Sequence, residues 1–220
     1  MSVWAVLAAA GSGDRLGADR PKAFVRLRDL PLLAESLRRL DASEWVDAIV
    51  VAAPPDWIEP AILLAEEIAA GKVSACVPGG ETRGESVRNA LQETPPDAAV
   101  VLVHDAARPV LPLEVVERVL TPLSEGWDGV VPALPIADTV KRVRGEEVTE
   151  TLPRGDLVAV QTPQAFVADV LRRAAASGGD ATDCAALVEA AGGRVKIVKG
   201  DRRLLKVTTQ QDLALVESWL

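Results

Sequence analysis

Apolar runs of strand length alternate along the chain with stretches in which apolar residues recur at helical spacing. Strands are predicted over residues 3–8, 48–53, 73–77, 98–103 and 129–133. Helices are predicted between them over 32–40, 58–65, 85–91 and 113–120. Continuous apolar strands that are each followed by a helix are typical of a mostly parallel sheet covered on both faces. The pattern therefore predicts an α/β fold.

The alternation of strands and helices breaks between about residues 136 and 157. Polar and apolar residues alternate over 139–144, Gly145-Glu146 predicts a turn, and a second strand follows over 148–152. This pattern indicates a protruding β-hairpin arm with polar faces. Such a hairpin buries too little apolar area to be stable alone in water. We therefore expect it to lie on another surface, of which a second copy of the chain is the simplest.

The last third of the chain returns to the regular pattern. Helices are predicted over 164–176, 182–191 and 211–220, and short strands over 194–198 and 205–207. In the helix expected after Pro54-Pro55, the apolar positions Ile58, Ile62, Leu63 and Ala65 recur at helical spacing.

The first strand runs into a glycine-broken loop that presents two cations. Gly11 and Gly13 allow a tight turn that brings backbone N–H groups to anionic oxygens. Arg15 and Lys22 add positive charge to the same place. Ligands of such sheets bind at the carboxyl ends of the strands. A dinucleotide loop is less favoured, because Leu16 occupies the third glycine position of that motif. The loop therefore predicts a nucleoside triphosphate site.

Composition restricts the partners and the compartment. The 220 residues carry a formal charge of −8, and the pI is near 4.8, which argues against nucleic acid and anionic membranes as partners. Cys76 and Cys184 have no metal-ligand spacing and are expected to be unpaired thiols in a reducing cytosol. No apolar run reaches the roughly 18 residues that a membrane span needs. A cytoplasmic protein is expected.

Two polar residues directly follow a predicted strand, and a lysine lies inside another, the short strand predicted over 205–207. Asp105 is interpreted as a carboxylate that faces a nucleotide beside a metal or ribose, with a cap for the helix after Pro109 as the alternative. His104, the only histidine, is expected to be a structural imidazole rather than a general base. Lys206 would need an anion if it faced inward, and a solvated edge lysine is the alternative.

Several motifs follow one another in a fixed order: residues 8–17 with Pro21-Lys22, then 86–91, 103–109, 138–141, 161–164 and 206–208. Together they resemble the 2-C-methyl-D-erythritol 4-phosphate cytidylyltransferases of the non-mevalonate isoprenoid pathway, from about residue 3 to 218. The chain departs from the family pattern at Cys184, where an acidic residue is common, and at Leu204-Leu205, where the family has Asn-Ile.

The resemblance implies a single nucleotidyltransferase domain over 1–220, with a Rossmann-like, nucleotide-diphospho-sugar-transferase-like fold and a dimerisation arm at about 136–157. The residues that it implies for binding CTP are Ala9, Ala10, Gly11, Ser12, Gly13, Gly79, Gly80, Glu81, Ser86, Asp105 and Ala106. Those implied for binding methylerythritol phosphate are Asp105, Arg108, Thr139, Arg154, Thr162, Thr182 and Lys206.

The implied catalytic residues are Arg15, Lys22 and Lys206. Mg²⁺ would bind mainly through the CTP phosphates, with Asp105 as a candidate ligand. Thr139 and Arg154 would reach from the arm into the active site of the partner in a homodimer.

The implied reaction transfers CMP from CTP to 2-C-methyl-D-erythritol 4-phosphate and releases pyrophosphate. Three alternatives stay open at this point. They are a cytidylyltransferase for another polyol phosphate such as ribitol 5-phosphate, a protein that binds CTP without catalysis, and a nicotinamide-dependent oxidoreductase. The presence of both Lys22 and Lys206 argues against the second.

Overall fold

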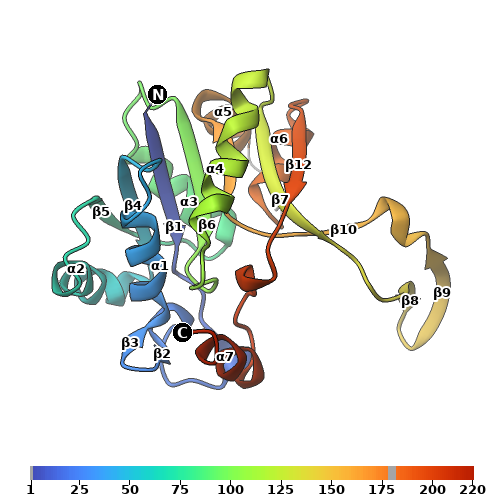
Figure 1. Ribbon diagram of the computed structural model, residues 1–220, viewed down its shortest axis with the longest axis horizontal. Helices are drawn as coiled ribbons and strands as arrows, with labels where there is room; N and C mark the ends of the chain where they lie inside the picture. The colour runs from blue at the N-terminus through green and yellow to red at the C-terminus, as the bar shows by residue number, and fades with distance from the viewer. Residues whose placement is uncertain (1, 178–181) are drawn as a thin grey trace.

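One eight-stranded sheet forms the centre of the computed structural model, which describes residues 2–177 and 182–220 (Figure 1). Its strands are β1 (Val3–Ala8), β4 (Ala48–Ala53), β5 (Val73–Pro78), β6 (Val100–Asp105), β7 (Gly129–Pro135), β10 (Val158–Val160), β11 (Gln164–Val167) and β12 (Val195–Lys199). They lie in the order β10-β7-β11-β6-β1-β4-β5, with β12 beside β7. Only the pairings of β10 and β11 are antiparallel, so the predicted mostly parallel sheet is confirmed.

Helices cover both faces of this sheet (Figure 1). They are α1 (Leu32–Asp41), α2 (Ile58–Glu67), α3 (Arg83–Gln92), α4 (Leu113–Leu120), α5 (Ala168–Ala176), α6 (Cys184–Ala190) and α7 (Gln210–Glu217). Helices α1, α2 and α4 share one apolar core with Ala5 and Leu7 of β1, whereas α3, α5 and α6 share the other with Val6. Successive side chains of a strand point to opposite faces. This explains why β1 is apolar at every position.

A third apolar cluster joins the C-terminal helix to the loop after β1. Leu16 and Val25 of the loop region share it with Val207, Leu213 and Val216. The Gln210 side chain also donates a hydrogen bond to the carbonyl of Leu16, at 2.8 Å. The loop is continued by a short ladder of β2 (Arg26–Leu27) and β3 (Leu30–Pro31). The C-terminal helix and the loop after β1 therefore pack together at the carboxyl end of that strand.

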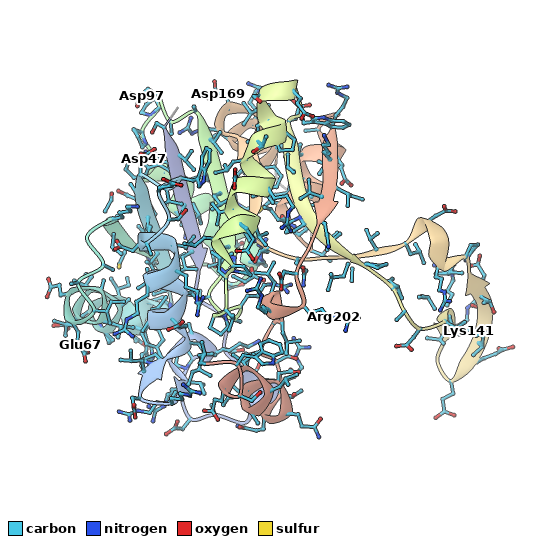
Figure 2. The ribbon with its side chains drawn as sticks, in the orientation of Figure 1. Asp47, Glu67, Asp97, Lys141, Asp169 and Arg202 are labelled. Atoms are coloured by element: carbon cyan, nitrogen blue, oxygen red, sulfur yellow. The ribbon has the colours of Figure 1, made fainter. Side chains whose placement is uncertain are left out.

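The predicted hairpin is present and projects away from the body of the molecule (Figure 1). It consists of antiparallel β8 (Val140–Arg144) and β9 (Glu147–Leu152). Lys141 marks it in Figure 2, well away from the sheet. Val143 and Val148 keep 59 % and 55 % of their surface exposed. The arm thus leaves apolar side chains uncovered by its own chain, as expected for a segment that needs another surface.

Two local predictions are wrong. Residues 164–167 form β11 rather than the start of a helix, because they pair between β6 and β7. Residues 205–207 form no strand, and the Val207 N–H instead makes a single hydrogen bond to the carbonyl of Ala107. The helix predicted after Pro54-Pro55 is present as α2, with Ala61, Leu64 and Ala65 on its buried face and Ile62 and Leu63 exposed.

Within the described residues, none of the helices combines the length and the apolar character needed to cross a bilayer. The carboxylates Asp47, Asp97 and Asp169 lie at the end of the sheet where β1, β4 and β6 begin (Figure 2). The opposite end of these strands carries the cavities described next.

Candidate active site

A cavity of about 350 Å³ opens at the carboxyl ends of β1 and β6. Its lining includes most residues predicted to bind CTP: Ala9, Ala10, Gly11, Ser12, Gly80, Glu81, Ser86, Asp105 and Ala106. Lys22 and Lys206 also line this cavity. The loop after β1, the start of α3 and the end of β6 therefore meet around one space, although they are far apart in the sequence.

Two glycines allow these loops to approach one another. Gly13 has a φ of 85°, and a Cβ at this position would lie 3.0 Å from the Cβ of Lys22. At Gly79, a Cβ would lie only 2.2 Å from the Cβ of Ala10. Any side chain would push the loops apart, and at Gly13 it would also need a left-handed backbone. These two glycines shape the wall rather than line the cavity.

The second wall is the entry into α3, which is held by its own hydrogen bonds. Thr82 and Glu85 form a capping box at the start of the helix. The Ser86 hydroxyl donates to the carbonyl of Thr82 at 3.0 Å and accepts from the N–H of Gly80 at 3.1 Å. Ser86 is predicted to bind the nucleotide, and in this structure its hydroxyl holds the loop that would surround the base.

Positive charge gathers in the first cavity. Lys22 is half-buried, and burial lowers its pKa, with Lys206 and Arg15 adding to the effect as neighbouring cations. Arg15 itself is exposed on the short turn Asp14–Leu16 and does not line the cavity. Cations held close together favour an anionic ligand, because it relieves their mutual repulsion.

Asp105 joins three cations at the end of β6. Its carboxylate accepts hydrogen bonds from Arg83 Nε and Lys206 Nζ, both at 2.9 Å, and Arg108 Nε lies 3.8 Å away. Burial raises the pKa of Asp105, but these cations outweigh it and hold the pKa well below its ordinary value. The inward orientation of Lys206 is thus observed, with Asp105 as its anion. The alternative role of Asp105 as a helix cap is wrong, since Pro112 precedes α4.

A second cavity of about 230 Å³ adjoins the first. It shares Arg83, Asp105 and Lys206 with the first cavity, and its other lining residues are Arg108, Val160, Gln161, Thr162, Gln164, Thr182 and Asp183. All the residues from the body of the chain that were predicted to bind the polyol phosphate are among them. Arg83 Nη2 and Arg108 Nε are buried and find no hydrogen-bond acceptor among the described residues.

The family model of 2-C-methyl-D-erythritol 4-phosphate cytidylyltransferase matches residues 3–220. The chain belongs to this family. A relative with that name from Saccharopolyspora erythraea is 49 % identical and aligned over 100 % of both chains. Another from Streptomyces avermitilis is 44 % identical over 98 % of this chain and 90 % of the relative. The chain is therefore a cytidylyltransferase, and the comparisons do not support the reading as an oxidoreductase.

Solved structures with the same activity in their names share the fold of this cytidylyltransferase. The enzyme from Thermus thermophilus superposes with a TM-score of 0.79 at 34 % identity. The match covers 97 % of this chain and 96 % of the Thermus chain. The 4-diphosphocytidyl-2C-methyl-D-erythritol synthase from Anaerococcus prevotii has a TM-score of 0.85 at 26 % identity, with 99 % and 97 % covered. The Rossmann-like nucleotidyltransferase fold is thereby confirmed.

The cytidylyltransferase site does not fit a metal ion held by the protein alone. No group of three or more His, Cys, Asp or Glu side chains in the described parts of the chain is arranged to bind one. Each oxygen of Asp105 already accepts a hydrogen bond from a cationic side chain. A Mg²⁺ ion bound to Asp105 would therefore have to share these oxygens with Arg83 and Lys206.

His104 has a structural role, as predicted. Its Nε2 lies 3.1 Å from the carbonyl of Arg108, which can only accept, so Nε2 carries the proton. Nδ1 then accepts from the Thr162 hydroxyl at 3.0 Å, and that hydroxyl accepts from the Asp105 N–H at 3.1 Å. The Thr162 hydroxyl proton is thus donated to His104 and not to a ligand in the cavity. Thr162 lines the second cavity and also fixes the backbone of Asp105.

We expect the free energy of unfolding to fall by about 3 kcal/mol as the pH drops from 7 to 4 because of His104. Burial lowers the pKa of His104 to about 4. The unfolded chain, with a histidine pKa near 6.5, binds a proton more readily, so the stabilisation is complete above about pH 6.5 and is lost as the pH falls toward 4. Urea unfolding at pH 7, 5.5 and 4.5 measures this slope. A His104→Gln variant with an equal slope over that range would contradict it.

Thr139 and Arg154 do not reach the cavities of their own chain. Both are exposed, and Arg154 donates a hydrogen bond to the carbonyl of Ala137, at the base of the arm. The arm lies to one side of the body and leads away from it (Figure 1). Their predicted role in substrate binding therefore requires a second chain.

Sequence reasoning assigned no role to two residues of the site, Arg83 and Gln164. Arg83 follows the Gly79-Gly80 turn, and its charge at the carboxyl end of the sheet was the available signal. Gln164 was placed in a helix, which hid its position beside the strand that carries Asp105. Its neighbour across the strands is Val103 of β6.

Proposed function

We propose that the chain transfers CMP from CTP to 2-C-methyl-D-erythritol 4-phosphate and releases pyrophosphate. The observation that carries this proposal is the pair of adjoining cavities that share Arg83, Asp105 and Lys206. The first has glycine-bearing loops and the cation Lys22, which suit a nucleoside triphosphate. In the second, Arg83 Nη2 and Arg108 Nε have no hydrogen-bond acceptor among the described residues, and such guanidinium N–H groups suit the phosphate of the acceptor.

The reaction would be an in-line attack of an acceptor phosphate oxygen on the α-phosphorus of CTP. The attacking oxygen is already an anion, so no strong general base is needed. His104 could not serve as one, because both ring nitrogens are engaged by Arg108 and Thr162. The site has to align two anions and neutralise their charge. Lys22, Lys206 and Arg15 would stabilise charge on the α-phosphate and on the leaving pyrophosphate.

Asp105 would keep the junction of the two cavities ordered. It holds Arg83 and Lys206 at 2.9 Å from its oxygens, on the line where the two substrates would meet. Without the carboxylate, three cations would repel one another and lose their fixed positions. CTP would enter as its Mg²⁺ complex, with the metal bound by phosphate oxygens and water, since Mg²⁺ commonly binds through substrate phosphates.

We further propose that the enzyme acts as a homodimer in which each arm completes the site of the partner. Thr139 and Arg154 would then bind the acceptor phosphate across the interface. The exposed Val143 and Val148 support this arrangement, because a partner surface would cover them. The cysteines Cys76 and Cys184 are unpaired, which agrees with a cytoplasmic, reducing location.

Pyrophosphate release from CTP tests the function directly. We expect release with 2-C-methyl-D-erythritol 4-phosphate and Mg²⁺, little with ribitol 5-phosphate, and none without an acceptor. Faster release with ribitol 5-phosphate would overturn the assignment of the acceptor. CTP binding without release for either acceptor would contradict the proposed transferase reaction.

A further inference from the structure

Gln164 leaves a buried hydrogen-bond acceptor at the wall of the second cavity. It lies on β11, lines this cavity and is only 1 % exposed. Its Oε1 finds no donor among the described residues. Leaving a buried acceptor unpaired costs about 1–3 kcal/mol, so native structures rarely contain one without a reason.

The orientation of the Gln164 amide is determined by its neighbours. Nε2 donates to Asp183 Oδ2 at 2.8 Å and lies 3.5 Å from the carbonyl of Gln161. Both neighbours can only accept, so a flipped amide would place Oε1 against a carboxylate. Asp183 is fixed in turn, because its Oδ1 accepts from the N–H of Ala186 as the cap of α6. Oε1 is therefore left as the free acceptor.

The other unpaired atoms of the same cavity are donors. Among the described residues, the buried side-chain polar atoms without partners are Arg83 Nη2, Arg108 Nε and Gln164 Oε1, and all three residues line this cavity. A ligand that satisfies them must combine anionic oxygens for the guanidinium groups with a donor for the amide oxygen. Inorganic phosphate meets the first requirement, whereas a hydroxylated phosphate ester meets both.

We propose that Gln164 is a specificity-determining residue whose Oε1 accepts a hydrogen bond from a hydroxyl group of the acceptor polyol phosphate. This inference rests on the proposed function and adds the recognition of the polyol to it. A site built to pair a substrate hydroxyl rejects an analogue that lacks it, since the buried acceptor is then left unpaired. The hydrogen bonds from Gln164 to Asp183 and from the hydroxyl to Gln164 would also orient the polyol, while Arg83 and Arg108 bind its phosphate.

The test compares 2-C-methyl-D-erythritol 4-phosphate with its 1-deoxy, 2-deoxy and 3-deoxy analogues. The wild-type enzyme should use one analogue with a kcat/KM at least about tenfold lower than that of the parent. In a Gln164→Leu variant, kcat/KM for the parent should fall about tenfold, and this analogue should be used nearly as well as the parent. The KM for CTP should not change. Unchanged discrimination in the variant would overturn the proposal, even if overall activity is lower.

Gln161 provides a matched control in the same cavity. Both ends of its side-chain amide already have partners within the protein, because Nε2 donates to the carbonyl of Asp201 and Oε1 accepts from the N–H of the same residue. Gln161→Leu should therefore affect all four acceptors equally. A loss of discrimination in Gln161→Leu that matches Gln164→Leu would indicate a general disturbance and overturn the proposal.

A titration of the wild-type protein covers the case in which Gln164→Leu does not fold. The side-chain amide resonances of ¹⁵N-labelled Gln164 should shift with 2-C-methyl-D-erythritol 4-phosphate and not with inorganic phosphate. No shift with a polyol phosphate that the enzyme turns over would overturn the role of Gln164. If only a different polyol phosphate is turned over, the proposed function fails, and the same titration with that acceptor still decides the role of Gln164.

Discussion

We expect Lys22→Ala to lower kcat by about 10²–10³ and to leave the melting temperature nearly unchanged, by analogy with the loss of one donor to an oxyanion. The side chain lies in the wall of the first cavity, where its charge would act on the α-phosphate and the leaving group. Its pKa is lowered by burial and by the cations Lys206 and Arg15, so the folded protein gains little from this charge. Steady-state pyrophosphate release and thermal unfolding measure the two effects.

Arg20 is the matched control for Lys22. It belongs to the same loop region, pairs with Asp19 at 2.9 Å and does not line the cavity. Exposed pairs of this kind contribute little, so Arg20→Ala should retain turnover within about twofold and a normal melting temperature. Near-normal turnover of Lys22→Ala would exclude a catalytic role for this lysine. A large drop in its melting temperature would mean that the loss of activity reflects unfolding.

Mixed subunits of Lys22→Ala and Arg154→Ala should regain activity that neither variant has alone. If Arg154 serves the partner's site, a mixed dimer contains one site with both defects and one site with neither. Random exchange at equal amounts makes about half of the dimers mixed, so about one quarter of wild-type activity should return. Activity is followed during exchange, and differently tagged chains show by mass spectrometry that mixed dimers form.

The control for subunit exchange combines Lys22→Ala with Lys206→Ala. Both lysines line the cavity of one chain, so every site in the mixed dimer still lacks one of them. No activity should return in this mixture. Recovery there, or no recovery with Arg154→Ala despite proven exchange, would contradict an active site shared through the arm.

Segments whose structure follows from local pattern could be predicted from the sequence. The run 48–53 is β4 with the predicted bounds, and Leu113–Leu120 is α4 with the predicted bounds. The hairpin of β8 and β9 was predicted from its alternation and turn. The prediction of a helix at 164–167 is wrong for a physical reason. The segment pairs with β6 and β7, and tertiary pairing overrides local propensity in such a short run.

The sequence by itself determined the sheet, the glycine-bearing loop after β1 and the arm, because burial on two faces, tight turns and strand alternation leave local patterns. It also predicted Lys22 and Asp105 for the nucleotide site, and both line the first cavity. The contacts between distant residues required the folded chain. Arg83 and Lys206 are 22 and 101 positions from Asp105, yet both meet its carboxylate. The unpaired oxygen of Gln164 likewise arises only where β11, α6 and the end of β6 enclose a cavity, since hydrogen bonding depends on distances that sequence spacing does not contain.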